Sequence, residues 1–191
     1  MEVLTATELK LRKPEILGKI RSGAVFIHPT DTIYGLGCNA LNQKAVEKIR
    51  QLKNRATGPF SIWVPNKEWI VKHCVVDKKV QVWLDKLPGP YTLIVRLKDK
   101  KALASNISAG VDTIGLRLPD HWFSKIVKEL DFPIVTTSAN KSGEPFMTSL
   151  EDLDPNIEKG VEFMMYEGPK EAKPSKIINP VTEEVVERFL K

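Results

Sequence analysis

The chain has 191 residues, of which 42% are hydrophobic and 28% are charged, a balance that is typical of globular proteins and excludes an intrinsically disordered chain. Lys and Arg outnumber Asp and Glu by 29 to 24, which gives a net charge of +5. This excess suits an anionic partner such as a nucleotide or RNA, but ordinary soluble proteins carry a similar excess equally often.

The residue types also disfavour several other classes of protein. Cys38 and Cys74 lie far apart and the three histidines lack metal-ligand spacing, so we expect neither a disulfide framework nor a structural metal site. The N-terminus has no apolar signal-peptide core, and no long uncharged apolar run follows it. We therefore expect a cytoplasmic protein that does not enter the membrane.

Helices and strands are predicted to alternate through the first two thirds of the chain. Thr5 and Glu8 have the spacing of a capping box, and Pro14 suits the first turn of a helix that continues to about Arg21. Asn42 is expected to cap the next helix. We predict strands over residues 24–27, 60–64, 91–97 and 113–118, and helices over 43–53 and 78–87.

The last third continues this alternation. Asp120 is expected to cap a helix that carries Trp122 and Leu130, and a short apolar strand follows at Pro133–Val135. Further strands are predicted over residues 161–166, 176–178 and 185–189. Interleaved strands and helices without a linker or repeat predict an α/β or α+β sheet domain over residues 1–191.

The most informative segment is the polar run that follows Pro133–Val135. It holds the hydroxyl and amide side chains of Thr136, Ser138, Asn140 and Ser142 in close succession. Polar groups at a strand end lie where open α/β sheets commonly bind ligands. This run therefore suits a polar, phosphate-bearing molecule better than a packed core.

Two other clusters allow both a structural and a functional interpretation. Thr30, Thr32 and Tyr34 lie beside two glycines that let the backbone approach a ligand closely, yet Thr-rich segments also form self-bonded turns. Lys53 and Arg55 follow a predicted helix, where they either hold a triphosphate or interact with the helix dipole. On spacing alone, the helix-dipole interpretation is favoured.

Arg117 stands among apolar residues at the end of a predicted strand. A half-buried guanidinium requires an anionic partner, which is either a neighbouring carboxylate of the chain or the carboxylate of a substrate. No Ser-His-Asp arrangement and no G-x-x-x-x-G-K-[ST] loop is present, which disfavours a hydrolase triad and a P-loop ATPase.

Taken together, these clusters resemble the YrdC-like family of threonylcarbamoyl-AMP synthases in its short, single-domain form. The resemblance spans about residues 23–175, and its five motifs occur in the order that the family shows. The motifs are Pro29–Leu36, Lys53–Arg55, Pro88–Thr92, Gly115–Pro119 and Thr137–Gly143.

The resemblance implies a twisted, mixed and largely open sheet, flanked by helices around a basic concave cavity. It also implies that ATP, L-threonine and bicarbonate (or CO₂) react to threonylcarbamoyl-AMP and pyrophosphate. A tRNA-modifying partner complex would then transfer the threonylcarbamoyl group to adenosine 37 of tRNA. Mg²⁺ would arrive with ATP rather than in a dedicated protein site.

The resemblance also assigns roles to individual residues. The catalytic set would be Lys53, Arg55, Ser138 and Asn140, which would bind ATP together with Thr113 and Ser142. The threonine-binding set would be Thr30, Thr32, Tyr34, Arg117 and Thr136. Trp63 departs from the family, because some members carry near this position a histidine that contacts threonine.

Two alternative functions stay open at this point. The same basic cavity would suit an RNA-binding module, and contact with tRNA or double-stranded RNA is expected as a secondary property. The sequence lacks the interleaved aromatic and basic residues of a dedicated single-strand binder. A paralogue with this fold that acts on another carbamoyl-type substrate is the second alternative.

Overall fold

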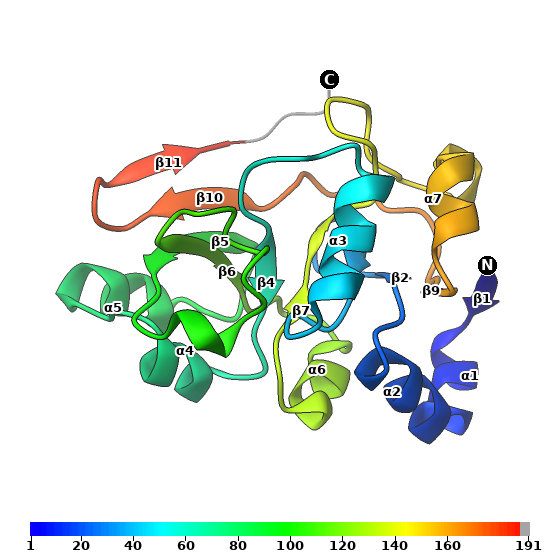
Figure 1. Ribbon diagram of the computed structural model, residues 1–191, viewed down its shortest axis with the longest axis horizontal. Coiled ribbons are helices and arrows are strands. Elements are labelled where there is room, and N and C mark those ends of the chain that lie inside the picture. The colour runs from blue at the N-terminus through cyan, green and yellow to red at the C-terminus, as the bar shows by residue number, and fades with distance from the viewer. Residues whose placement is uncertain (188–191) are drawn as a thin grey trace.

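The computed structural model describes residues 1–187, and it builds them into two mixed β-sheets with helices around them (Figure 1). The first sheet has the strand order β1-β9-β2-β3-β8. β1, β9 and β2 are parallel, while β3 is antiparallel to both of its neighbours. Its strands are β1 (Glu2–Leu4), β9 (Phe163–Met165), β2 (Phe26–His28), β3 (Gly35–Gly37) and β8 (Thr137–Ser138).

The second sheet has the strand order β11-β10-β5-β6-β4-β7. β10 pairs in parallel with β5, and β6 pairs in parallel with β4, while the other neighbours are antiparallel. Its strands are β11 (Glu184–Val186), β10 (Lys176–Asn179), β5 (Tyr91–Arg96), β6 (Thr113–Arg117), β4 (Ser61–Trp63) and β7 (Ile134–Val135).

The helices begin where the chain supplies capping side chains. The Thr5 hydroxyl accepts from the Glu8 amide in the predicted capping box, and the Asn42 amide oxygen accepts from the amide of Ala45. The helices are α1 (Ala6–Leu11), α2 (Lys13–Arg21), α3 (Gln43–Leu52), α4 (Lys67–His73), α5 (Lys78–Asp85), α6 (Ser124–Leu130) and α7 (Pro155–Gly160). No helix within residues 1–187 is long and apolar enough to cross a membrane.

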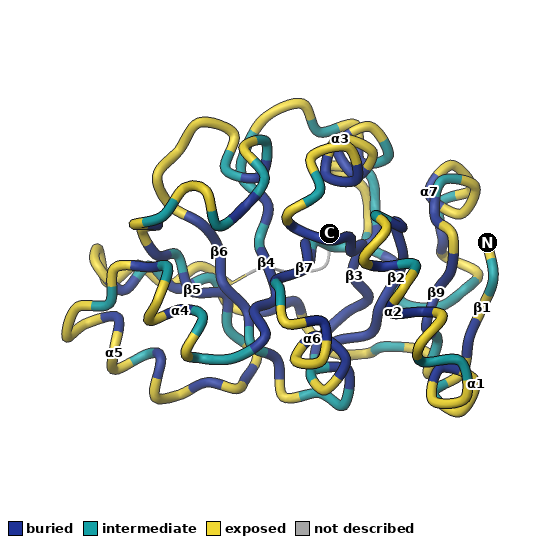
Figure 2. Tube along the Cα trace, turned by 60° about the horizontal axis from the view of Figure 1, so that its bottom comes forward, coloured by how far each residue is buried: buried dark blue, intermediate teal, exposed yellow. Residues whose placement is uncertain are grey.

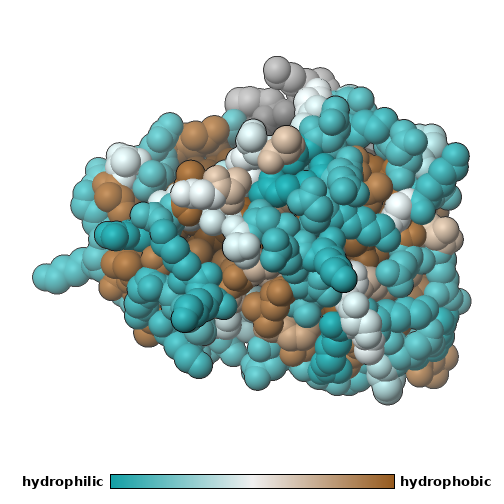
Figure 3. All heavy atoms as spheres, in the orientation of Figure 1, coloured by the Kyte–Doolittle hydropathy of each residue, from teal (hydrophilic) through white to brown (hydrophobic). Residues whose placement is uncertain are grey.

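Strand alternation divides the apolar side chains between two cores. Phe26 and Phe163 face a cluster that α1, α2 and α6 help to form, whereas Ile27 and Met164 face a cluster that includes α3 and the second sheet. Burial of each of these side chains contributes roughly 1.5–3 kcal/mol. The central strands are accordingly dark in Figure 2, and the outer turns of the helices are exposed. The surface in Figure 3 is mostly hydrophilic, with scattered apolar groups.

The two sheets meet where β7 continues into β8. Ile134 and Val135 pair with β4 of the second sheet, and Thr137 and Ser138 pair with β3 of the first. Thr136 lies between them, and its amide donates to the carbonyl of Ser61 at 2.9 Å. The polar run singled out in the sequence therefore crosses from one sheet to the other.

Most predicted elements are confirmed, with boundaries that differ by a few residues. One sheet was expected, whereas the structure has two. The predicted Asp120 cap is wrong, because α6 begins at Ser124 and its N-cap position is Phe123. Asp120 instead donates its backbone amide to Asp31 at 3.3 Å. Of the strand predicted over residues 185–189, positions 188–189 lie outside the described residues. Strands β1, β3 and β8 and helices α4 and α7 were not predicted.

Candidate active site

A cavity of about 230 Å³ opens where the two sheets meet. Arg117 and Gly115 come from β6, Tyr34 and Gly35 from β3 and the loop before it, and Thr136 from the seam between β7 and β8. The walls thus combine both sheets. The lining residues are Thr30, Ile33, Tyr34, Gly35, Arg55, Pro59, Phe60, Ser61, Thr92, Ile94, Gly115, Arg117, Thr136, Thr137, Ser138 and Ile177.

Gly115 keeps the floor of this cavity open. A Cβ atom at this position would lie 2.5 Å from the Ser61 hydroxyl oxygen and 3.0 Å from a Thr92 methyl carbon. These distances are shorter than van der Waals contact, so only glycine lets β4, β5 and β6 pack together here.

Arg117 ends β6 with its side chain 7% exposed at the cavity. Its Nη2 donates to the Asp31 carboxylate at 2.7 Å and to the Thr32 hydroxyl at 3.2 Å. The sequence left two possible partners for Arg117, a carboxylate of the chain or the carboxylate of a substrate. The structure pairs it with a carboxylate of the chain, that of Asp31. Asp31 holds the guanidinium in place at the cavity wall, where a planar fork suits recognition of a carboxylate.

Thr30 and Tyr34 build the adjoining wall. The Thr30 hydroxyl donates to the carbonyl of Ile33 at 2.8 Å and accepts from the amide of Thr32, which is the self-bonded turn considered above. Thr32 is buried behind Thr30 and does not line the cavity. Burial raises the pKa of the Tyr34 phenol, so this hydroxyl stays protonated at neutral pH.

The segment of residues 167–170, here called the strap, closes over this wall. The Tyr34 hydroxyl accepts from the amide of Glu167 and donates to the carbonyl of Gly168 at 2.7 Å. The Lys170 ammonium donates to the Thr30 carbonyl at 2.9 Å and to the Glu167 carboxylate. The strap is thus fastened to the loop that carries Thr30 and Tyr34.

The Glu167 carboxylate also joins the strap to the loop after β6. It accepts from the Trp122 indole at 2.6 Å and lies 3.0 Å from Nε2 of His121. Burial alone would raise the pKa of Glu167, but the hydrogen bonds from Lys170, Trp122 and His121 outweigh burial and lower it.

A second cavity, of about 430 Å³, is lined by Lys53, Arg55, Ser138, Asn140, Ser142 and Gly143. Two segments that are distant in the sequence form it, because the carbonyl of Lys53 accepts from the amide of Ser142 at 2.9 Å. Its walls present two cations, two hydroxyls and an amide, which are the donors that bind phosphate groups. All five residues predicted from the Lys53–Arg55 and Thr137–Gly143 motifs to bind phosphates are brought together here.

Lys53 is buried at 2% exposure and orders the second cavity. Its ammonium donates to the carbonyls of Ser138 at 2.6 Å and Asn140 at 2.7 Å, and to the Asn140 side-chain oxygen at 3.0 Å. The Ser138 hydroxyl donates to the same Asn140 oxygen at 2.5 Å. Lys53 therefore fixes the 138–140 backbone and places a positive charge behind it. The ammonium also pairs with the polar loop across the cavity and is not a solvated charge at the end of α3.

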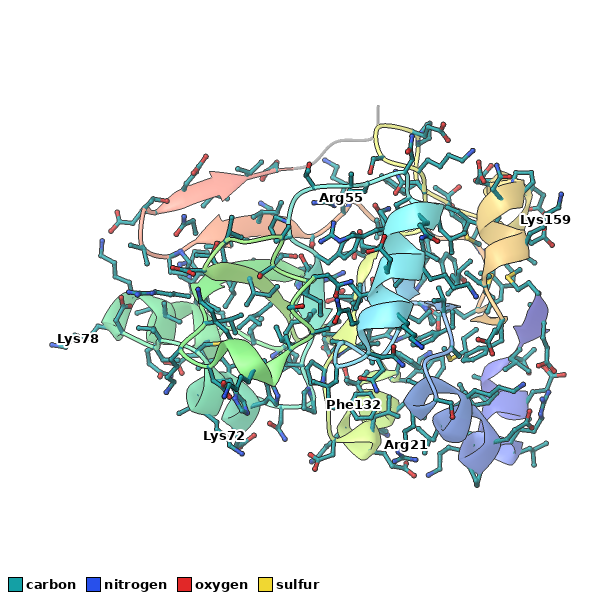
Figure 4. All side chains as sticks on the ribbon, viewed as in Figure 1. Arg21, Arg55, Lys72, Lys78, Phe132 and Lys159 are labelled. Carbon is teal, nitrogen blue, oxygen red and sulfur yellow. The ribbon has the colours of Figure 1, made fainter. Side chains whose placement is uncertain are left out.

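Arg55 and Ser138 line both cavities, so the two cavities adjoin, and together they are called the cleft. Arg55, labelled in Figure 4, lies on the loop after α3. Its guanidinium donates to the carbonyl of Pro59 at 2.9 Å and stands 5.2 Å from the centre of the Phe60 ring. Thr113 lines neither cavity; it is exposed at the start of β6, two residues from Gly115.

Sequence reasoning missed several residues of the cleft. Ser61, Thr92 and Thr137 line the first cavity, but only strand pairing places Ser61 and Thr92 beside Gly115. Trp63 is fully buried in the aromatic cluster with His28 and lines neither cavity.

Comparison with known proteins relates this geometry to one family. The Sua5_yciO_yrdC family model, described as telomere recombination, matches residues 18–188. A relative from Methanocaldococcus jannaschii is 38% identical over 182 residues, which cover 93% of this chain and 83% of the relative. The threonylcarbamoyl-AMP synthase of Bacillus subtilis is 31% identical over 169 residues, 85% of this chain and 49% of that protein.

Solved structures indicate the same family as these relatives. Pyrococcus abyssi Sua5 complexed with L-threonine superimposes with a TM-score of 0.79 at 27% identity. The similarity covers 93% of this chain and 53% of the Pyrococcus chain. The chain thus spans about half the length of the Bacillus and Pyrococcus proteins.

Proposed function

Because the chain belongs to the Sua5/YciO/YrdC family, we propose that it is a threonylcarbamoyl-AMP synthase, with residues 1–191 acting as one YrdC-like domain. The observation that carries this proposal is the cleft, in which the cavity with Lys53 and Arg55 adjoins the cavity with Arg117. The cavity of Lys53 and Arg55 suits the phosphates of ATP, and the cavity of Arg117 suits a small amino acid.

The reaction joins three anionic groups, so catalysis depends on positioning and on charge stabilisation. The amine of L-threonine adds to CO₂ derived from bicarbonate, which gives a carbamate and releases a proton. A carbamate oxygen then attacks the α-phosphorus of ATP, the bond to the β-phosphate oxygen breaks, and pyrophosphate leaves. Mg²⁺ would be supplied together with ATP and would neutralise part of the phosphate charge.

Each part of the cleft has a proposed role in these reaction steps. Arg55 and the charge of Lys53 stabilise the phosphates, while Asn140 and Ser142 supply neutral hydrogen bonds, and Ser138 does so when its hydroxyl turns from Asn140 to the phosphate. The Arg117 guanidinium binds the threonine carboxylate, and Asp31 keeps it oriented at 2.7 Å. Thr30, Tyr34 and Thr136 surround the amino acid, whereas Thr113, which lines neither cavity, has no role in this arrangement. The product then passes to a tRNA-modifying partner.

Pyrophosphate release from ATP with bicarbonate tests the proposal when L-threonine, L-serine and no amino acid are compared. We expect release that requires both bicarbonate and threonine. Release with another carbamoyl donor but without threonine would identify a paralogue with a different substrate. Absence of release, together with RNA affinity that falls steeply with salt, would identify an RNA-binding module instead.

A further inference from the structure

Arg50 belongs to neither cavity, yet its side chain organises the loop that carries Arg55. It lies on the last turn of α3 and is 6% exposed. Its guanidinium donates to the carbonyl of Asn106 at 2.6 Å, the carbonyl of Gly58 at 3.0 Å and the carbonyl of Arg55 at 3.2 Å. The same guanidinium stands 4.5 Å from the centre of the Phe60 ring.

The loop of residues 53–60 is tied to Arg50 at several points. The backbone amide of Arg55 donates to the carbonyl of Arg50 at 2.9 Å, so the two residues are bonded in both directions. The Phe60 amide donates to the carbonyl of Ile107 at 3.0 Å, next to the Asn106 carbonyl that Arg50 binds. Arg50 therefore clamps this loop to the 106–107 segment.

Only a guanidinium suits this position. Its planar fork reaches the carbonyls of three residues in two separate segments at once, whereas an ammonium on a flexible stem is a single point of contact. Burial lowers the pKa of Arg50, which shows that the environment disfavours a charge. A buried cation that is held by backbone carbonyls fixes the geometry of the segments that supply them.

We propose that Arg50 is a positioning residue that holds the 53–60 loop so that Arg55 faces the phosphate end of the cleft. The consequence for ATP rests on the function proposed above, but the ordering of the loop does not. Without the clamp, the Arg55 and Gly58 carbonyls lose their shared partner, and the Arg55 side chain is no longer aimed at the cavity.

Three variants separate the clamp from a general loss of stability. Arg50→Met removes both the charge and the fork, and Arg50→Lys keeps only the charge. Arg21→Met is the matched control, because Arg21 (labelled in Figure 4) lies at the exposed end of α2, and its side chain donates to the Glu129 carbonyl at 3.3 Å. Calorimetric titration measures binding of MgATP and of L-threonine, and hydrogen exchange measures the Arg55 and Phe60 amides.

Both Arg50 variants should weaken MgATP binding by about tenfold or more, and L-threonine binding should also weaken, because Arg55, Pro59 and Phe60 of this loop line the first cavity as well. Exchange of the Arg55 and Phe60 amides should rise in both variants, and exchange in β6 should stay unchanged. Arg21→Met should match the wild type. Unchanged MgATP binding, unchanged exchange in the loop, exchange that rises equally in β6, or full rescue by lysine would overturn the proposal.

Gly58→Ala provides a second route to the same loop if Arg50→Met does not fold. Gly58 has a φ of +81°, and an added Cβ would lie 3.1 Å from Nη2 of Arg55. We expect the same loss of MgATP binding with unchanged exchange in β6, and unchanged MgATP binding would count against the clamp. If the wild type binds no MgATP, the proposed function fails, and loop exchange in the Arg50 variants still decides whether Arg50 positions the loop.

Discussion

His28 is a buried titratable residue directly behind the cleft. Its ring is fully buried, stacks on Phe123 at 5.5 Å and packs edge-on against Trp63 at 5.5 Å. Burial lowers its pKa from 6.5 to about 3. The folded state therefore keeps this imidazole neutral over a pH range in which the unfolded chain takes up a proton.

Acidification should consequently destabilise the protein through His28. Because the folded pKa is lower than the unfolded one, the stability is complete above about pH 6.5 and is lost as the pH falls. Between pH 7 and 4.5 this residue should account for about 2–3 kcal/mol of lost unfolding free energy. Urea titration of the wild type and of His28→Phe at both pH values measures the difference. If the unfolding free energy depends equally on pH in the two proteins, the loss does not come from His28. His121 is present in both proteins, so its titration does not affect the comparison.

Arg117 gives a second test at the scale of one side chain. Arg117→Lys keeps the charge beside Asp31 but loses the fork, so recognition of the threonine carboxylate should weaken selectively. We expect the KM for threonine to rise about tenfold, or ~1.4 kcal/mol, with the KM for ATP changed less than about twofold. Steady-state pyrophosphate release measures both values, with Arg21→Lys as control. A parallel rise in both constants would argue that Arg117 serves the whole site and not the amino acid.

At the scale of the elements, the attachment of the strap (residues 167–170) depends on the carboxylate of Glu167. Glu167 accepts from Lys170 and Trp122 and faces His121, so Glu167→Gln should lower the unfolding free energy at pH 7 by about 1–2 kcal/mol. The pKa of Glu167 is lowered in the fold, so this stabilisation is present above about pH 4.5 and disappears as the pH falls through the folded value.

Chemical denaturation at pH 7 and pH 3.5 checks this expectation. Glu129→Gln is the control, because Glu129 forms an exposed ion pair with Lys13 that contributes at most about 1 kcal/mol. A difference between wild type and Glu167→Gln that persists unchanged at pH 3.5 would contradict the role of the ionised carboxylate.

The elements that the sequence predicts well are those with local signals. Asn42 marks the start of α3 and the β-branched run at Thr113 marks β6, and both boundaries are found within a residue. β3 was missed because Gly35–Gly37 has no β propensity, and its strand conformation depends on pairing with β2 and β8. Asp120 does not cap α6, because a bend and turn at residues 121–123 separate it from the start of the helix.

The residues of the cleft divide in the same way into those with a local sequence signal and those without one. Motifs located Lys53, Arg55 and Ser138, which stand in compact polar clusters, and Arg117, which is a single charge among apolar residues. The clamp of Arg50 could not be predicted, because the carbonyls it binds belong to residues 55, 58 and 106 and carry no sequence signature. Likewise, the hydrogen bond from the Lys53 ammonium to Asn140 could not be predicted, because the two residues belong to motifs that are far apart in the sequence.

At the scale of the whole molecule, both sheets contribute to the cleft. Arg117 projects from the second sheet, and Ser138 belongs to the first, at the point where the chain passes between them. A ligand that fills both cavities therefore contacts both sheets, and it should stabilise the fold by mass action. Neither sheet alone carries the complete set of groups that the reaction requires.

The most direct test is a crystal structure with L-threonine and a non-hydrolysable ATP analogue bound together. The account predicts the triphosphate in the cavity of Lys53, Arg55 and Ser138, with the threonine carboxylate at Arg117 and its amine directed toward the α-phosphate. Density for the two ligands on separate surfaces, or a nucleotide outside the Lys53 cavity, would contradict it.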